Sequence, residues 1–304
     1  MPERSTMASA LLCLGALVVL GGCGGAAESS QPERSAAAKA PEGDKKHRLE
    51  AVKADCMKQK GFKYVAYVPP GRPESDEELK RASGDYQAMR KYSAKYGFGV
   101  FAEFAYPEEM KRRADNGKEA EKDPNFAIQG KLSEAQAGAY RKASDACVKV
   151  AAKQVLGKDV KSDMDFYNTI NKALERARTA TLDSDPKLVE LAAGMAACLK
   201  DKGYPIGKTT PSAMSGRGFK VFLDQSDSLG RKQRDDVPDV APPVKDGEAR
   251  MVYPPQLSAA EARPYMDKEI KAALDDLECG KDFYPAYSPK EKAVAQQVND
   301  EFGV

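Results

Sequence analysis

The chain of 304 residues has no tryptophan, one histidine and no Cys-x-x-Cys motif. A single histidine argues against Ser-His-Asp and Cys-His catalysis, which need an imidazole base, and against histidine-rich zinc sites. The absence of Cys-x-x-Cys argues against thioredoxin-like redox chemistry. The histidine, His47, lies in the polar stretch DKKHRLE, and we expect it to be an exposed side chain rather than a ligand.

The chain also lacks an excess of either charge. It has 48 Lys and Arg against 46 Asp and Glu, a net charge of +2, and the basic residues are spread along the sequence. Because nucleic-acid binding needs clustered cations that neutralise phosphates, we expect no nucleic-acid partner. The 31% of charged residues suits a well-solvated extracytoplasmic surface.

No apolar run is long enough to cross a membrane. The run from Ala8 to Leu20 has about a dozen residues where a span needs roughly 20, and it is typical of a secretory signal. It ends in Leu20-Gly21-Gly22-Cys23, which resembles the bacterial lipobox. That resemblance implies that residues 1–22 are a lipoprotein signal peptide and that Cys23 carries diacylglycerol. The alternative is an ordinary secretory signal cleaved near 25–27.

Residues 23–46 are rich in Gly, Ala, Ser and Pro and have no apolar periodicity. Such a composition cannot bury a core and predicts a flexible tether. Two acyl chains, for example palmitoyl chains, attached to one residue anchor a protein stably in a membrane. The expected location is therefore the cell membrane, lipid-anchored on its extracytoplasmic face, with the folded part beginning near His47.

Cysteine usage fits an exported protein. Cys13 falls in the predicted signal, and Cys23 is assigned to the lipid. An even number of remaining cysteines in an exported chain implies disulfides, with three possible connectivities. A four-cysteine zinc site is the alternative, although zinc ligands usually come in close pairs. The four remaining cysteines are Cys56, Cys147, Cys198 and Cys279.

An internal repeat favours one connectivity. LEAVKADCMKQKGF (49–62) aligns with LAAGMAACLKDKGY (191–204), with cysteine, two lysines and glycine in register. The next cysteine of each half follows a Leu-Ser start with Gln136 or Glu261 three residues after the serine, which is a helix capping box. The repeat therefore predicts the pairs Cys56–Cys147 and Cys198–Cys279.

The predicted fold class is mostly α with small β elements (α+β), built as two related disulfide-stapled helical units. The first repeat unit covers 47–157, a connecting helix 158–184 and the second unit 185–304. Apolar periodicity predicts most of the chain to be helical. Aromatic and β-branched runs predict strands over 62–68, 97–106 and 218–225, and residues 235–256 read as a proline-rich loop.

Several residue groups invite a functional interpretation. The carboxylate pairs Asp163/Asp165 and Asp275/Asp276 are candidates for acid/base chemistry, and we favour solvated helix faces. Aspartates of the second-half loop are weak calcium candidates without EF-hand spacing. Tyrosines among lysines can bind sugars or peptides, but we favour an amphipathic core edge. These residues are Asp227, Asp235, Asp236 and Asp239, and Tyr64, Tyr67, Tyr86, Tyr92, Tyr96, Tyr284 and Tyr287.

The combination of Cys23, CMKQKGF (56–62), KYGFG (95–99), DPN (123–125) and DPKLVELAAGMAACLKDKGY (185–204) resembles a group of uncharacterised lipoproteins of actinomycete bacteria. The resemblance covers most of residues 47–304. It implies a surface location and supplies no catalytic residues.

The expected function is that of a non-enzymatic binding or interaction module at the cell envelope, without cofactor or metal. Its expected partners are the membrane, through the lipid on Cys23, and an envelope protein or cell-wall glycan. One alternative is the solute-binding receptor of a transporter, which needs two α/β lobes. The other is a cell-wall hydrolase with two carboxylates facing each other across a deep cleft.

Overall fold

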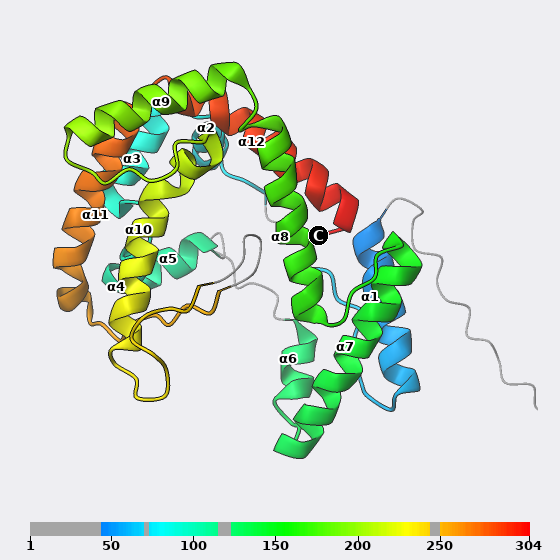
Figure 1. Cartoon of the computed structure of the whole chain (residues 1–304). Helices are drawn as coiled ribbons and strands as arrows, with labels where there is room; N and C mark the ends of the chain where they lie inside the picture. Colours follow the sequence, from blue (N-terminus) through cyan, green and yellow to red (C-terminus); the bar gives the residue numbers. More distant parts are fainter. Residues whose placement is uncertain (1–43, 70–72, 115–122, 244–249) are drawn as a thin grey trace, which may run out of the picture. The chain divides into compact units, whose positions relative to one another are not determined.

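The computed structural model describes residues 44–69, 73–114, 123–243 and 250–304, and these residues form twelve helices and no strand (Figure 1). The mostly helical prediction is confirmed. The first seven are α1 (Lys45–Gln59), α2 (Asp76–Ala82), α3 (Tyr86–Tyr96), α4 (Ala102–Ala105), α5 (Pro107–Ala114), α6 (Pro124–Gln129) and α7 (Glu134–Leu156). The others are α8 (Asp163–Thr181), α9 (Pro186–Asp201), α10 (Pro211–Arg231), α11 (Ala259–Cys279) and α12 (Phe283–Phe302).

Local signals determine where the main helices begin. Capping boxes at Ser75, Ser133 and Ser258 start α2, α7 and α11, and in each the serine and the residue three positions later bond reciprocally. Such boxes satisfy backbone donors that have no partner inside the helix. The capped starts of α7 and α11 were predicted from sequence and are confirmed.

The repeated sequence ends α1 and α9 in the same way. Gly61 and Gly203 adopt φ of 80° and 87°, a region that favours glycine. The next residue then donates its N–H back to the carbonyl five positions earlier, Phe62 to Met57 and Tyr204 to Leu199, both at 3.0 Å. This is the Schellman ending of a helix. It turns an aromatic residue toward the partner helix.

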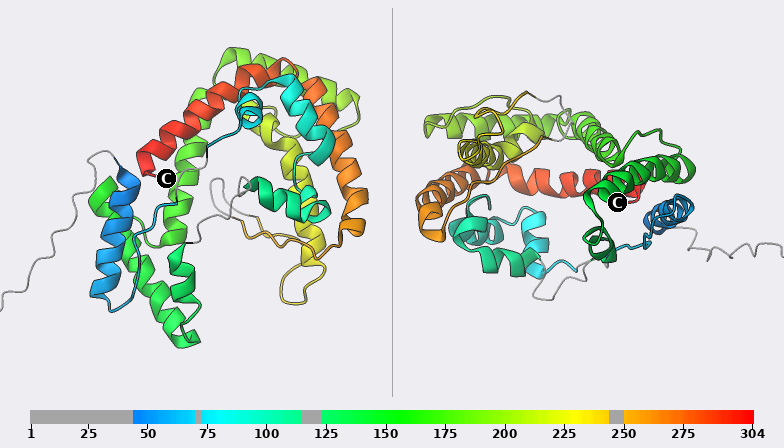
Figure 2. Two further views of the ribbon diagram at one scale, coloured as in Figure 1. Left: turned by 180° about the vertical axis from the view of Figure 1, so that it is seen from behind. Right: turned by 90° about the horizontal axis from the view of Figure 1, so that it is seen from below.

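Each disulfide joins two helices that pack against each other. α1 lies along α7, and α9 lies against α10, α11 and α12 (Figures 1 and 2). α3 and α4, from the first predicted unit, pack on α11 of the second. The largest core cluster centres on α9, with Leu188, Met195 and Leu199 against Leu277 and Phe283.

The strand predicted over 218–225 is wrong, because these residues lie inside α10. The buried positions Met214, Gly218, Phe222 and Ser226 recur every four residues, which is a helical and not a strand period. A side chain at Gly218 would collide with Phe98, since a Cβ there would lie 2.0 Å from the ring. The aromatic and β-branched composition misled the prediction.

The strand predicted over 62–68 is also wrong, although this segment is not helical. Its backbone forms hydrogen bonds with a side chain instead of with a neighbouring strand. The amide of Asn125 accepts from the Val65 N–H and donates to the Val65 carbonyl, both at 2.9 Å. Asn125 is buried at the start of α6. Its side-chain amide therefore makes the two backbone hydrogen bonds that a paired strand would make with Val65.

The third predicted strand, 97–106, is wrong for a related reason. The segment turns at Gly97 and then forms α4. The N–H groups of Val100 and Phe101 each donate to one oxygen of the Glu269 carboxylate at 2.8 Å. Glu269 lies on α11 and is fully buried. Burial raises the pKa of Glu269, and the backbone N–H groups oppose that rise.

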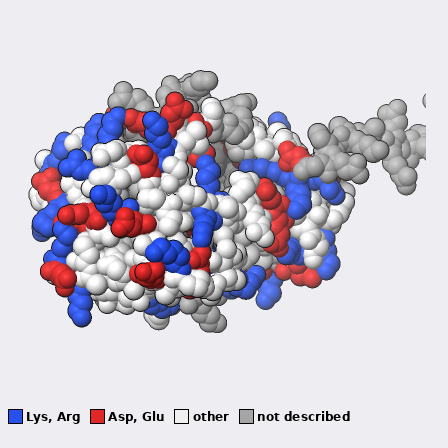
Figure 3. Space-filling model, turned by 90° about the horizontal axis from the view of Figure 1, so that it is seen from above, with Lys and Arg blue, Asp and Glu red and all other residues white. Residues whose placement is uncertain are grey.

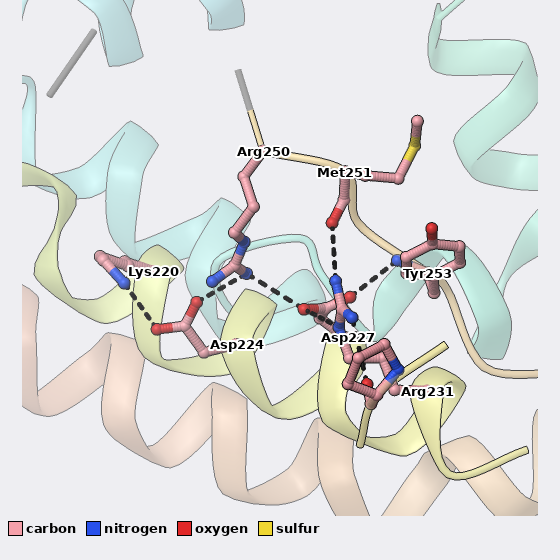
Figure 4. A network of polar contacts seen from close by, with 8 residues as sticks. Lys220, Asp224, Asp227, Arg231, Arg250, Met251 and Tyr253 are labelled. Carbon is pink, nitrogen blue, oxygen red and sulfur yellow. Dashed lines mark hydrogen bonds and ion pairs between the residues drawn. The ribbon is translucent and has the colours of Figure 1, made fainter. Parts of the chain in front are cut away.

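The predicted proline-rich loop is confirmed as irregular backbone where it is described, over 235–243 and 250–256. Side chains of α10 hold it (Figure 4). Buried Asp227 accepts from the Tyr253 N–H at 2.8 Å, and it pairs with buried Arg231 at 2.9 Å. Arg231 in turn donates to the carbonyls of Pro238 and Met251, both at 3.2 Å.

We therefore expect Arg231→Ala to lower the free energy of unfolding by about 3 kcal/mol, because it removes the buried partner of Asp227 and leaves only the longer ion pair with Arg250, at 3.5 Å. The control is Arg234→Ala, which removes the exposed pair with Asp236 at 2.8 Å and is expected to cost less than about 1 kcal/mol. Urea unfolding of both variants measures the difference. An equal loss of unfolding free energy in the two variants would contradict this role of Arg231.

Candidate functional site

The four predicted disulfide cysteines pair as the repeat indicated. Cys56 is bonded to Cys147 and Cys198 to Cys279, each with a Cα–Cα distance of 5.5 Å. The zinc alternative is therefore wrong, because every one of these sulfurs is bonded to another sulfur. Cys23 lies outside the described residues, so its lipidation stays a prediction.

Each disulfide closes a long loop, and the chain-entropy model gives such cross-links about 4–5 kcal/mol at most. We expect the double variant Cys56→Ser/Cys147→Ser to lose about 2–5 kcal/mol of stability in urea unfolding. Non-reducing peptide mapping of the unaltered protein is expected to join the Cys56 and Cys147 peptides. A link between Cys56 and Cys198 would contradict the pairing.

The candidate carboxylate pairs do not form catalytic dyads, because each member turns to its own partners. Asp163 accepts from Lys53 at 3.1 Å and from Ser144 at 2.8 Å. Asp165 accepts from the Lys161 N–H at 2.8 Å. The two pairs therefore do not supply the facing acids that the hydrolase alternative requires.

The members of the second pair, Asp275 and Asp276, lie in different environments and have pKa values shifted in opposite directions. A hydrogen bond from Lys271, with further bonds from Tyr204 and Lys202, holds the pKa of Asp275 at about 2. Asp276 is buried, and this burial raises its pKa to about 6 despite hydrogen bonds from Tyr284 and Arg217. Asp275 therefore lies in an ion-pair network near the surface, whereas its neighbour Asp276 lies in the core.

The raised pKa of Asp276 makes stability depend on pH. The folded protein holds this proton more tightly than the unfolded chain, whose carboxyl titrates near 3.8. The contribution is therefore fully present below about pH 4 and is lost as pH rises toward 6. Over that window the free energy of unfolding is expected to fall by about 3 kcal/mol relative to Asp276→Asn. Urea unfolding of both proteins at a series of pH values tests this, and parallel curves would contradict it.

Two of the four candidate calcium aspartates have cationic partners. Asp227, which lies on α10 and not in the loop as predicted, is held by Arg231, and Asp236 is held by Arg234. Within the described ranges, no group of three or more His, Cys, Asp or Glu side chains is placed to hold a metal ion. None of the seven tyrosines is exposed, in agreement with a core-edge role, and three are buried: Tyr96, Tyr284 and Tyr287.

A small apolar cavity lies beside the first disulfide-linked helix pair, between α1, α7 and α8. Its volume is about 140 Å³. Val148, Ala151 and Ala152 of α7 form one wall, and these three side chains are buried. Phe166 of α8 and Leu49 of α1 form others. The remaining lining residues are Lys46, Glu50, Lys53, Asp163, Gly303 and Val304.

One face of α1 supplies the polar rim of this cavity. Four residues of α1 are spaced three or four apart and so share a face of the helix: Lys46, Leu49, Glu50 and Lys53. Lys53 is 15% exposed and pairs with Asp163 at 3.1 Å. Glu50 accepts from the Tyr64 hydroxyl at 2.8 Å. An apolar pocket with a few converging polar groups is the usual form of a ligand site.

Sequence reasoning did not find this cavity. It singled out Asp163 only as a partner of Asp165, whereas the structure brings Asp163 to Lys53 across the α1–α8 contact. The available signal was the set of small residues Ala151 and Ala152 on the apolar face of α7. That signal identifies a helix contact and not a cavity, because the space depends on how α1 and α8 pack.

Other hollows surround α2 and are more open. One is lined by Leu79, Ala82, Pro289 and Ala293, between α2 and α12. A second, on the α3 side, is lined by Glu74, Glu78 and Arg81 and by Tyr92, over which Arg81 stacks at 4.2 Å. On the face drawn in Figure 3, acidic and basic side chains are interspersed. Charge therefore marks no single binding surface there.

Comparisons with known proteins give no family. No protein-family model, no curated protein and no solved structure matches the chain. Among the described residues, no helix combines the length and the apolar character needed to cross a bilayer.

Proposed function

We propose that this protein is a lipid-anchored, extracytoplasmic binding module of the cell envelope that is not an enzyme. The observation that carries the proposal is the pair of disulfides, Cys56–Cys147 and Cys198–Cys279. Disulfides form and persist in oxidising compartments outside the cytoplasm. They agree with the signal-like segment 8–20 and the lipobox-like ending at Cys23, which supply the proposed anchor.

The site geometry supports binding rather than catalysis. The cavity beside α1 and α7 combines apolar walls with polar groups that already have partners, Lys53 with Asp163 and Glu50 with Tyr64. The carboxylates with raised pKa, Glu269 and Asp276, do not line this cavity or the hollows around α2. They are held in the helical core by backbone N–H groups and by Tyr284 and Arg217.

The transporter receptor is less well supported. That class needs two lobes of alternating strands and helices around a cleft, and residues 44–69, 73–114, 123–243 and 250–304 contain no strand. The carboxylate hydrolase lacks facing acids at Asp163/Asp165 and Asp275/Asp276. A partner at the envelope, either a protein or a cell-wall glycan, remains the proposed ligand of the module as a whole.

The anchor is tested by Cys23→Ala. Without the thiol no diacylglycerol can attach, so most of the protein is expected to move from the membrane fraction to the soluble extracytoplasmic fraction. Fractionation with immunoblotting measures the shift, and metabolic labelling with an alkynyl palmitate measures the lipid directly. Cys13→Ala is the matched control and is expected to leave both readouts unchanged. Persistent membrane attachment of Cys23→Ala would refute the anchor.

A further inference from the structure

The near-zero net charge of the whole chain conceals a difference between the two disulfide-linked helix pairs. Residues 44–69, which contain α1, and α7 (134–156) together carry 11 Lys and Arg against 5 Asp and Glu. The matching residues of the second copy, 186–211 and 259–279, carry 7 against 8. The first pair is therefore basic, whereas the second is close to neutral.

The repeated lysines show one origin of this difference. In the second copy, Lys202 pairs with Asp275 at 3.1 Å and with Glu278 at 2.9 Å, both on α11. Lys60 stands at the matching position of the first copy, but α7 has alanine at the two positions that correspond to these acids. A cation at the end of a helix is favourable in both copies. In the first copy its charge is not neutralised by the partner helix.

Four exposed lysines lie at the end of the first pair where α1 ends and α7 begins (Figure 1). Phe62 and Leu132 pack into the same core cluster, which holds the segments that carry the lysines side by side. Among the residues that the structure describes, none of the four forms an ion pair. These lysines, called the basic end below, are Lys58, Lys60, Lys63 and Lys131.

The acids near the basic end do not cancel its charge. Residues 55–69 and 123–142 carry 6 Lys and Arg against 3 Asp and Glu. The three acids are Asp55 on α1, Asp123 at the N-cap of α6 and Glu134 in the first turn of α7. This part of the surface therefore attracts anions.

An exposed aromatic side chain lies beside the basic end. Phe126 of α6 is 71% exposed. Its neighbour Asn125 bonds to the backbone of Val65, two residues after Lys63, so α6 lies next to the segment that carries this lysine. Apolar and aromatic side chains among cations are typical of surfaces that lie in the headgroup region of a membrane.

The predicted anchor leaves the basic end within reach of the membrane. About 20 residues separate Cys23 from the start of α1 at Lys45, and a flexible chain of that length spans about 25 Å on average. α1 has 15 residues and is about 22 Å long. The far end of α1 can therefore contact the bilayer to which the chain is tethered.

We propose that the basic end and Phe126 dock on a membrane surface that contains anionic phospholipid. The lysines contact the headgroup phosphates, and the ring enters the interface between headgroups and acyl chains. The proposal rests on the proposed membrane-anchored function and adds a second membrane contact to it. Such contacts are weak and screened by salt, and the tether strengthens them by raising the local concentration of lipid. Docking alone does not hold the protein, in agreement with the expected release of Cys23→Ala.

Lysine acetylation, read at each residue by mass spectrometry, tests the docking. The full chain is reconstituted in nanodiscs of phosphatidylcholine, with or without phosphatidylglycerol. With the anionic lipid, the basic end is expected to react about three- to tenfold more slowly, and high salt should remove this protection. Three exposed lysines of the second half, Lys200, Lys208 and Lys268, are the control lysines and should react equally in both lipids. Equal rates at the basic end in the two lipids would overturn the proposal.

A soluble polyanion distinguishes a membrane from an anionic polymer as the partner. Inorganic polyphosphate is added to the neutral nanodiscs, and we expect it to protect the basic end less than the anionic nanodiscs do, because it offers no interface for Phe126. Protection by polyphosphate without protection by the anionic lipid would overturn the membrane as the partner.

A triple variant assigns the docking to the lysines. In Lys58→Gln/Lys60→Gln/Lys63→Gln, the remaining Lys131 reports on the contact, and we expect it to react equally fast in neutral and anionic nanodiscs. The matched control replaces the three control lysines with Gln, which removes the same charge from the second half and should leave Lys131 protected. All six positions are exposed, so both variants are expected to keep their thermal midpoints. Equal protection of Lys131 in the two variants would overturn the role of the lysines.

Phe126→Ala tests the ring. We expect Lys131 to react about threefold faster in this variant in anionic nanodiscs, because the apolar part of the contact is lost. Phe219→Ala, at a position of α10 that is 48% exposed, is the control and should leave the rate unchanged. An unchanged rate in Phe126→Ala would overturn the role of the ring.

Failure of the docking and failure of the anchor give different results. If the basic end reacts equally in the two lipids while Cys23→Ala releases the protein, the docking is wrong and the anchor stands. If Cys23→Ala stays on membranes while the basic end is protected by anionic lipid, the lipid attachment is wrong and the docking stands.

Discussion

The covalent link between Cys56 on α1 and Cys147 on α7 is the constraint on which the packing of α1 depends. α1 begins at Lys45, so the last two residues of the predicted tether (23–46) are helical, and α1 has little apolar surface of its own, with Met57 as its buried residue. The disulfide fixes α1 along α7 over the cluster of Met57, Tyr140 and Cys147. The same contact sets the distance between the cavity-lining face of α1 and the alanines of α7, and therefore shapes the cavity between them.

The second half also has two helices joined by a disulfide, but their surroundings differ. Cys198 and Cys279 join α9 to α11, and here the linked pair lies in the largest core cluster. The matching helix ends at Gly61 and Gly203 show that the repeated sequence specifies local geometry as well as the position of the thiol. What differs is the environment, since the first pair has a small cavity beside it and the second pair lies in the largest core cluster.

Features governed by local rules were predictable from sequence. Serine caps and the disulfide pairing depend on residues near in sequence or on the repeat itself, and they were confirmed. The strands over 62–68, 97–106 and 218–225 were not. In the first two, a buried side chain from elsewhere, Asn125 or Glu269, bonds to the backbone where a strand would have bonded. In the third, the four-residue spacing of buried positions overrides composition. The cavity was not predictable, because its rim and walls come from three helices and from Gly303 and Val304, which are far apart in sequence.

The central claim is that the Cys56–Cys147 link holds α1 against α7 and thereby maintains the site beside them. Hydrogen–deuterium exchange with mass spectrometry, applied to the unaltered protein and to Cys56→Ser/Cys147→Ser under native conditions, tests it most directly. The account predicts faster exchange in peptides of α1, α7 and the first turns of α8, with α9 and α11 unchanged. Unchanged exchange in α1 and α7, or an equal increase throughout the chain, would contradict it.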